Sequence, residues 1–212
     1  MTFSFRVVLL LDSKSKEKIL EELERIVKNC TKCPLHEGRT NAVFGDGNID
    51  ADIMFIGEAP GRNEDLQGKP FVGQAGKLLT EAIESIGLNR SDVYITNVVK
   101  CRPPKNRDPT KEEIAACEPY LDKQISIINP SIIVTLGRFA MRYMLNKYNL
   151  GSHTISKVRG RIFELHTLDK TIYFIPTYHP AAILYRQGLK FEFQSDFMKI
   201  KELLGKIKLK RK

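Results

Sequence analysis

The sequence contains no apolar run long enough to cross a membrane. The longest run near its start, residues 7–11 (VVLLL), is far shorter than the roughly 20 apolar residues that a spanning helix needs. No small-residue cleavage site follows it, so it is not a convincing signal peptide. We therefore expect no membrane association and a cytoplasmic location.

Internal repeats and low-complexity linkers are also absent. A chain of 212 residues without them fits one domain with a sizeable core and short extensions. We expect residues 15–205 to form that domain. Residues 1–14 are expected to be an N-terminal extension, either an added strand or a disordered arm, and residues 206–212 a basic C-terminal tail.

Cysteine is scarce, and its placement argues against disulfides. The chain has one Cys-x-x-Cys pair and two further cysteines, which in a cytosolic protein favours metal or cluster binding. Four thiolates suit either tetrahedral zinc or an iron–sulfur cluster, and sulfur ligation alone does not distinguish them. The alternative is four unrelated buried thiols. The residues are Cys30, Cys33, Cys101 and Cys117.

Positive charge is in excess, with a net charge of +9 and a pI of about 9.4. This balance favours a polyanionic partner, nucleic acid first and an anionic membrane second, although a merely basic protein is the simpler alternative. A proline-rich loop carries four of the cations and is suited to phosphate contact. These are Lys100, Arg102, Lys105 and Arg107.

Apolar patterns predict an α/β fold. Short β-branched runs predict strands at residues 53–56, 93–99, 132–136, 162–165 and 171–175, and helical spacing predicts helices at 16–28, 74–86, 110–128 and 192–207. Residues 110–113 form a capping box, and Pro119 predicts a kink or break in the helix that follows. Strands that alternate with helices indicate a mainly parallel sheet covered on both faces.

Three polar residues follow or end separate strands of this pattern, namely Glu58, Asn97 and His179. Ligands of open α/β sheets bind beyond the carboxyl ends of the strands, so we expect these side chains to meet there. An amide can pair with a base edge, although Asn97 also fits a simple turn position. His179 alone would more often be an ordinary surface or core residue. Phe71 is either a core aromatic or a stacking platform for a base.

Four stretches resemble a known family in sequence and order. They are residues 57–61 (GEAPG), 68–76 (GKPFVGQAG), 94–104 (YITNVVKCRPP) and 179–182 (HPAA). Together they resemble the uracil-DNA glycosylases that carry an iron–sulfur cluster, usually called family 4, over the range from Cys30 to Arg186. The resemblance implies a three-layer α/β/α sandwich around a mainly parallel four-stranded sheet. It also implies a monomeric base-excision repair enzyme that flips uracil out of DNA and hydrolyses its N-glycosidic bond.

The resemblance implies a role for each residue of the pocket. Phe71 would stack on uracil, Asn97 would donate to O4 and accept from N3–H, and His179 would bond O2 as the base departs with negative charge. Cytosine reverses the donor and acceptor order that Asn97 meets, and would be rejected. The motif Glu58, Ala59 and Pro60 would form the floor of the pocket.

Two positions depart from better-known uracil glycosylases, which carry Asp where this chain has Ala59 and Tyr where it has Gly61. Family 4 lacks both, so the departure is consistent with that family. It leaves the group that activates water open, with Glu58 or the backbone as candidates. Glu64 is the candidate for excluding the methyl group of thymine.

The resemblance also implies contacts outside the pocket. Ile183 or Leu184 would be the wedge that fills the gap left by the flipped nucleotide, and Arg186 would contact DNA with the basic loop. The cysteine spacing is similar to this family's, which implies a structural 4Fe–4S cluster on the four cysteines. The chain ends outside the resemblance are candidates for a partner-docking arm, a sliding-clamp contact or a disordered end.

Two other functions stay open. One is a cysteine-metal nucleic-acid-binding module without catalysis, which would not need Glu58, Asn97 and His179 together. The other is a related glycosylase with broader base choice, such as hypoxanthine or xanthine. Gly61 together with Asn97 favours narrow use of uracil.

Overall fold

The fold is described from a computed structural model, which covers residues 12–167 and 170–210. Most of the predicted N-terminal extension lies outside this range. Its last three residues do not: Asp12 caps helix α1, which begins at Ser13 and runs to Lys28. The last helix, α9 (Lys190–Lys210), likewise continues through most of the predicted basic tail. The division of the chain into a domain and two extensions stays a prediction.

The centre of the molecule is one six-stranded sheet in the order β1-β3-β2-β4-β6-β5. The four central strands are parallel, as predicted, and the two edge strands are antiparallel to their neighbours. The count of four that the resemblance implies leaves out both edge strands: β1, which has only two residues, and β5, which the apolar pattern at residues 162–165 does predict. The strands are β1 (Asp46–Gly47), β2 (Ile53–Gly57), β3 (Tyr94–Asn97), β4 (Ile132–Leu136), β5 (Phe163–His166) and β6 (Thr171–Thr177).

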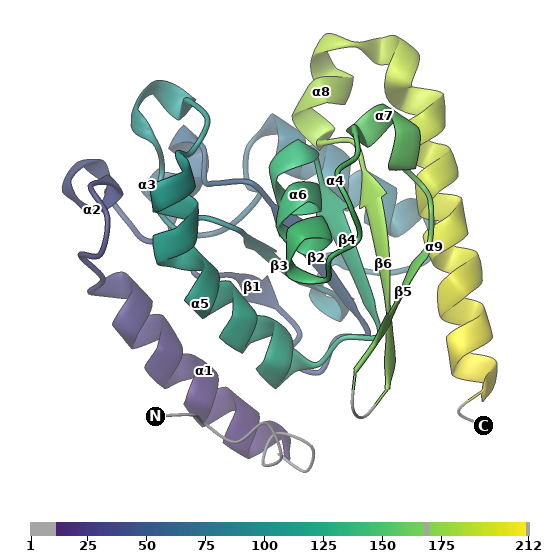
Figure 1. The fold of residues 1–212 in the computed structure, drawn as a ribbon, viewed down its shortest axis with the longest axis horizontal. Coiled ribbons are helices and arrows are strands. Elements are labelled where there is room, and N and C mark those ends of the chain that lie inside the picture. Colours follow the sequence, from purple (N-terminus) through teal and green to yellow (C-terminus); the bar gives the residue numbers. More distant parts are fainter. Residues whose placement is uncertain (1–11, 168–169, 211–212) are drawn as a thin grey trace.

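Helices cover both faces of this sheet, which confirms the three-layer sandwich (Figure 1). Successive strand residues point to opposite faces, so Met54 and Ile56 pack with one helix layer while Ile53 and Phe55 pack with the other. The first layer contains α1, α5 (Lys111–Ile128), α6 (Arg138–Lys147) and α7 (Ile155–Val158). The second contains α4 (Gln74–Ser85), α8 (Pro180–Tyr185) and α9.

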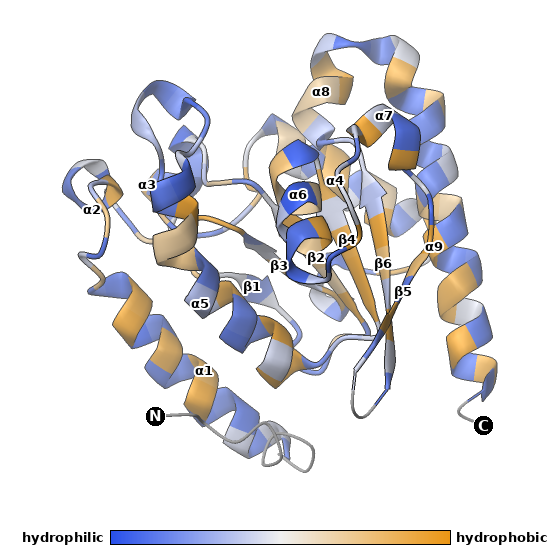
Figure 2. Ribbon diagram, in the orientation of Figure 1, coloured by the Kyte–Doolittle hydropathy of each residue, from blue (hydrophilic) through white to orange (hydrophobic). Residues whose placement is uncertain are grey.

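Hydropathy follows this layering. The central strands β2 and β4 are mostly apolar, as expected for strands buried on both sides of the sheet, while the helices are apolar mainly on one side (Figure 2). Helix α5 has the predicted capping box at Thr110 and Glu113. It continues through Pro119 to Ile128, so the predicted break does not occur. No helix of the described residues is long and apolar enough to cross a membrane.

The remaining elements are short. They are α2 (Leu35–Gly38), α3 (Arg62–Gln67) and the 3-10 turns at Arg90–Asp92, Pro104–Asn106 and Gln187–Leu189. The carboxyl ends of the parallel strands meet at one edge of the sheet: Gly57 of β2 is in register with Asn97 of β3. Val99 N donates to Glu58 O at 2.9 Å, which keeps the two chains paired just beyond the strands. The edge is therefore a rigid base for the loops that carry the predicted site.

Candidate active site and cysteine cavity

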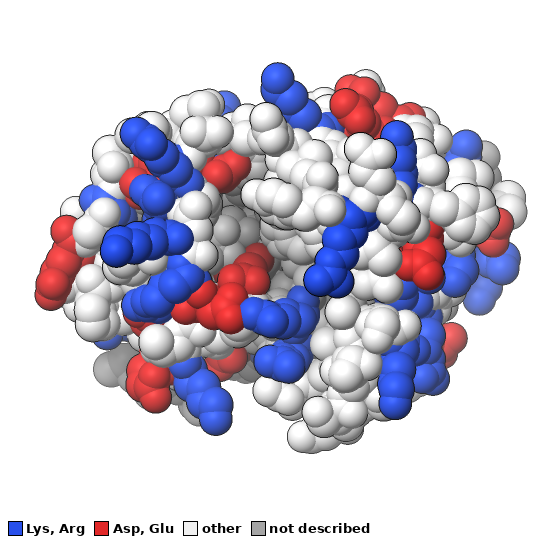
Figure 3. Space-filling model, turned by 90° about the horizontal axis from the view of Figure 1, so that it is seen from above, with Lys and Arg blue, Asp and Glu red and all other residues white. Residues whose placement is uncertain are grey.

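A cleft of about 340 Å³ opens at the carboxyl edge of the strands. Figure 3 looks onto this edge and shows a hollowed surface with Lys and Arg side chains around it. The structure brings every predicted base-contacting residue to this one cleft. Those lining it are Glu58, Ala59, Pro60, Glu64, Phe71, Asn97 and His179.

Asn97 presents an unpaired acceptor in the cleft. Asn97 is 1% exposed, and its Oδ1 atom has no hydrogen-bond partner among the described residues. A buried polar atom of this kind normally has a partner, since leaving it unpaired is costly. Gly57 makes room for the amide, because a Cβ at that position would lie 2.3 Å from Asn97 Oδ1. The amide is thus held ready for a ligand that donates a hydrogen bond.

His179 presents a donor to the same cleft. It is the N-cap of α8, and its Nδ1 atom accepts a hydrogen bond from Ala181 N at 3.1 Å. Burial lowers the pKa of His179 to about 4, with the charge of Glu64 acting weakly in the opposite direction. The imidazole is therefore neutral at physiological pH, and since Nδ1 accepts, the proton lies on Nε2.

Phe71 lies beside His179, with ring centroids 5.6 Å apart and an interplanar angle of 31°. Its backbone adopts a left-handed conformation, with φ of 51°, which is unfavourable for a bulky side chain. Gly76 allows helix α4 to approach, because a Cβ there would lie 1.9 Å from Phe71 O. Arg90 Nη2 donates to Pro70 O at 2.5 Å and fixes the loop from the other side.

Glu64 supports this loop through its carboxylate. Its Oε1 atom accepts from Val72 N and Gly73 N, both at 2.9 Å. The sequence suggests that Glu64 excludes thymine. The structure instead gives the carboxylate a positioning contact with the Phe71 loop, although the residue also lines the cleft.

Glu58 is the titratable carboxyl group at the floor of the cleft. Its pKa is raised to about 7, mainly by burial and also by the charge of Asp108, while Arg138 acts in the opposite direction. Asp108 and Arg138 also form an ion pair with each other. A carboxyl group with a pKa near neutrality can exchange a proton at physiological pH, which suits a general base.

The predicted basic loop divides into exposed and buried residues. Arg102 and Lys105 reach the surface, and Arg107 lines the cleft while pairing with Glu113 through two contacts of 2.6 and 2.8 Å. Lys100 is only 1% exposed, so its assignment to the DNA-binding surface is wrong. The charge pattern alone does not reveal this, because all of residues 98–101, which follow β3, are buried in the folded chain.

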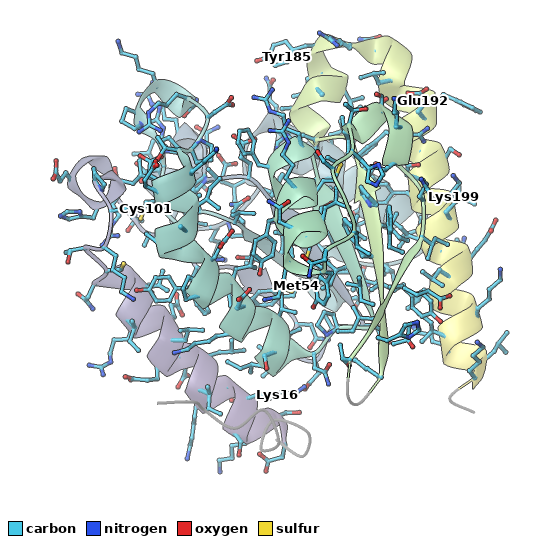
Figure 4. All side chains as sticks on the ribbon, viewed as in Figure 1. Lys16, Met54, Cys101, Tyr185, Glu192 and Lys199 are labelled. Carbon is cyan, nitrogen blue, oxygen red and sulfur yellow. The ribbon has the colours of Figure 1, made fainter. Side chains whose placement is uncertain are left out.

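The two wedge candidates also differ. Ile183 is 3% exposed and packs in the core beneath α8, so it does not reach a bound nucleic acid. Leu184 is 41% exposed, and Tyr185 beside it is 88% exposed at the outer end of α8 (Figure 4). Arg186 is exposed at the same end. The sequence does not predict that Tyr185 is exposed, because a helix of six residues is too short to show a periodic pattern of apolar residues.

The four cysteines line a second, smaller cavity between α1, α5 and the loop after β3. Figure 4 marks Cys101 there, beside the start of α5. Within residues 12–167 and 170–210, no three His, Cys, Asp or Glu side chains converge closely enough to form a metal site. The four thiols nevertheless line one cavity, although Cys33 and Cys117 are far apart in sequence.

Hydrogen-bond donors surround the sulfur atoms of this cavity. Arg39 Nη1 donates to Cys101 Sγ at 3.1 Å, Tyr120 Oη donates to Cys30 Sγ at 3.2 Å, and the Lys100 backbone donates to Cys117 Sγ at 3.4 Å. Donors to sulfur suit thiolates that hold a metal or cluster. The donor set, four sulfurs and no carboxylate, fits an iron–sulfur cluster or zinc.

Comparison with known proteins identifies the family to which this chain belongs. The family model for the uracil DNA glycosylase superfamily matches residues 44–202. The type-4 uracil-DNA glycosylase of Archaeoglobus fulgidus is 55% identical over 187 residues, which are 88% of this chain and 94% of that protein. Those of Sulfurisphaera tokodaii and Saccharolobus solfataricus are each 55% identical, covering 87% and 84% of this chain and 84% and 83% of the relatives.

The chain therefore belongs to the uracil-DNA glycosylase superfamily. Within that superfamily it is a member of the type-4 uracil-DNA glycosylases, which confirms the resemblance seen in its motifs.

Proposed function

We propose that this chain removes uracil from DNA by hydrolysing its N-glycosidic bond, with Asn97 and His179 as the groups that read and release the base. Family membership makes it a uracil-DNA glycosylase of base-excision repair. The observation that supports the residue assignment is the unpaired, buried Oδ1 atom of Asn97 beside a neutral His179 and the ring of Phe71.

The order of donor and acceptor on the Asn97 side chain explains how the site would recognise uracil. Uracil offers N3–H to Asn97 Oδ1, and its O4 accepts from Asn97 Nδ2. Cytosine lacks the N3 proton and carries an amino group at C4, so both contacts become unfavourable. A site whose buried polar groups are left unpaired by the wrong ligand can discriminate strongly. Phe71 supplies a flat apolar surface for the ring of either base, and so adds affinity without discrimination.

Release of the base places negative charge on uracil. The bond between C1′ and N1 breaks with its electron pair remaining on uracil, and the sugar becomes oxocarbenium-like. His179 Nε2–H donates to O2, where part of that charge resides, while the proton stays on the imidazole. A fixed donor in a site from which water is excluded gives a large stabilisation of such charge.

Glu58 is proposed to orient and deprotonate the water that completes the reaction. The water oxygen bonds to C1′, its proton passes to the carboxylate, and the products are free uracil and an abasic site. Ala59 provides no carboxyl group of its own for this step. The pKa of Glu58, near 7, allows the carboxylate to accept the proton and to return it to solvent.

We also propose that Cys30, Cys33, Cys101 and Cys117 hold a 4Fe–4S cluster with a structural role. Three hydrogen bonds to their sulfur atoms and their shared cavity support this assignment. When bound, such a cluster supplies a rigid link between α1, α5 and the loop that follows β3.

The proposed DNA-binding surface consists of Arg102, Lys105, Arg107, Leu184 and Arg186, with Leu184 as the wedge. The loop that carries the first three of these residues and helix α8, which carries Leu184 and ends just before Arg186, each contribute residues to the lining of the cleft. A monomeric state, a cytoplasmic location and a contact with a sliding clamp stay predictions from the sequence.

A cleavage assay tests the proposed function. An oligonucleotide with a single uracil is incubated with the protein and treated with alkali, which breaks the strand at an abasic site. Matched oligonucleotides carry thymine, cytosine or hypoxanthine at the same position. We expect scission for uracil alone. Scission of the hypoxanthine strand would indicate the broader glycosylase, and a folded, cluster-containing protein that binds DNA without any scission would indicate a binding module.

A further inference from the structure

Lys100 lies buried between the uracil cleft and the cysteine cavity. Its Nζ atom donates to the backbone oxygen of Asn97 at 2.7 Å, to Thr96 Oγ1 at 2.6 Å and to Gln124 Oε1 at 2.6 Å. An ammonium group has three donors, so this set satisfies it completely. The side chain is therefore held in a single position.

None of these three acceptors carries a charge, and Lys100 takes part in none of the ion pairs of residues 12–167 and 170–210. Burial of a cation without a carboxylate partner is unfavourable. An apolar side chain of similar length would fill the same space without this penalty. The directed hydrogen bonds of the ammonium are thus the feature that needs a functional explanation.

The contacts extend from Lys100 to the first helix layer. Gln124 Nε2 donates to Tyr94 Oη at 3.1 Å and to Phe44 O at 3.0 Å, and Thr96 Oγ1 donates to the same carbonyl at 2.7 Å. All these groups are buried. The carboxyl end of β3 is consequently tied to α5 from the side opposite the cleft.

The side-chain amide of Asn97 has little to fix it beyond its own backbone, which is paired with Gly57 of β2. Neighbouring side chains on a strand point to opposite faces, so Thr96 points toward α5 while Asn97 lines the cleft. No hydrogen bond from the described residues reaches the Asn97 Oδ1 atom. Its direction is set by packing against Gly57 and by the position of its own backbone. Lys100 holds that backbone.

We propose that Lys100 is a positioning residue for uracil excision, which fixes the carbonyl of Asn97 and thereby aims its side-chain amide at the base. This inference rests on the proposed contact between Asn97 and uracil. Lys100 also lines the cysteine cavity, and its backbone nitrogen donates to Cys117 Sγ at 3.4 Å. One residue thus joins the cysteine cavity to the base-reading amide, so a displacement at the cavity is passed to Asn97.

A double-mutant cycle tests the proposal. Single-turnover excision rates and DNA dissociation constants are measured for the wild type, Lys100→Met, Asn97→Ala and the double variant. We expect Lys100→Met to lower the rate by about 100-fold, the usual consequence of a displaced contact group, with little change in DNA affinity. Because Lys100 acts through Asn97, the same substitution should have almost no further effect in the Asn97→Ala background.

Two milder variants cover the case in which Lys100→Met does not fold or loses its iron. Thr96→Val and Gln124→Met each remove one acceptor of the ammonium, and neither residue lines the cysteine cavity. We expect each to lower the rate by about tenfold, again only when Asn97 is present. Iron content and melting temperature are recorded for every variant.

The outcomes separate the inference from the function on which it rests. If the rate losses of the two single substitutions multiply in the double variant, Lys100 does not act through Asn97, and the positioning role is overturned. The proposed contact between Asn97 and uracil would then still stand. An unchanged rate in Asn97→Ala alone would overturn the proposed uracil contact, and the inference with it. If a substitution at Lys100, Thr96 or Gln124 lowers the rate only when Asn97 is present, and the protein keeps its iron, the result supports both the positioning role of Lys100 and the contact between Asn97 and uracil.

Discussion

Gly57 and Asn97 are paired residues at the ends of β2 and β3, and a single added methyl group would bring them into collision. A Cβ at position 57 would lie 2.3 Å from Asn97 Oδ1 and 2.6 Å from the ring of Phe71. The absence of a side chain at Gly57 therefore creates the space in which a base can meet both groups.

Gly57→Ala is expected to lower uracil excision by about 100-fold, because the new methyl group displaces the amide and the ring from the base. The fold should survive, since overpacking of this kind typically costs about 1–3 kcal/mol. Single-turnover rates and thermal melts measure the two effects. Gly205→Ala is the control: it lies within α9 with nothing near its Cβ position, and should leave the rate unchanged. Equal rates for Gly57→Ala and wild type would contradict this account of the pocket.

Glu58→Gln is expected to change the pH dependence of excision as well as its rate. Burial raises the pKa of Glu58 to about 7, so the wild-type rate should increase through pH 7 as the carboxylate forms. His179, with its pKa lowered to about 4, stays neutral throughout and adds no second step above pH 5 or so. Glutamine cannot titrate, so the variant should be slow and should lack the increase in rate through pH 7. A wild-type-like pH step in Glu58→Gln would show that another group is the base.

Much of this site could be predicted from the sequence, for a physical reason. Strand ends are set by local patterns, and parallel strands bring their carboxyl ends to one edge, so Glu58, Asn97 and His179 met as expected. Side-chain direction after a strand is set by tertiary packing instead. For that reason Lys100, which lies in a fully buried segment, and Ile183, which lies next to the exposed Leu184, are wrongly predicted to belong to the DNA-binding surface.

Strand β1, at one edge of the sheet, also could not be predicted from local sequence patterns. β1 has two residues, and its pairing with β3 depends on contacts that no periodic pattern records. Glu64 is another example, because only the folded loop shows that its carboxylate accepts two backbone hydrogen bonds.

Cys101→Ser and Cys117→Ser are each expected to lose iron and visible charge-transfer absorption, and to melt at a lower temperature. The wild type should contain about four iron atoms per chain, as a 4Fe–4S cluster requires. Tyr120→Phe is the matched control, because it removes only the hydrogen bond to Cys30 Sγ and leaves all four sulfurs in place. Metal analysis and absorption spectra test this prediction. A colourless wild type with one zinc per chain would contradict the cluster assignment.

Lys105→Ala is expected to weaken binding to all DNA sequences equally and to reduce the salt dependence of binding. Removing one phosphate contact should lower the slope of log K against log salt by about one. Lys105 lies in the exposed loop beside the cleft, whereas Lys201 is exposed on α9, a helix of the other layer, and serves as the control. Titrations at several salt concentrations measure the slope. Identical slopes for Lys105→Ala and Lys201→Ala would remove the loop from the proposed surface.

Leu184→Ala and Ile183→Ala are neighbouring substitutions with opposite expected consequences. Leu184 is exposed, so its loss should slow excision from double-stranded DNA, where a wedge must hold the helix open. Single-stranded DNA needs no such opening, and excision from it should change little. Ile183 is buried among α4 and α9 side chains, so Ile183→Ala should instead destabilise the fold by about 2–5 kcal/mol through a cavity. Rates on both substrates and urea unfolding distinguish the two effects. Equal slowing of both substrates by Leu184→Ala would mean that this residue does not act as the wedge.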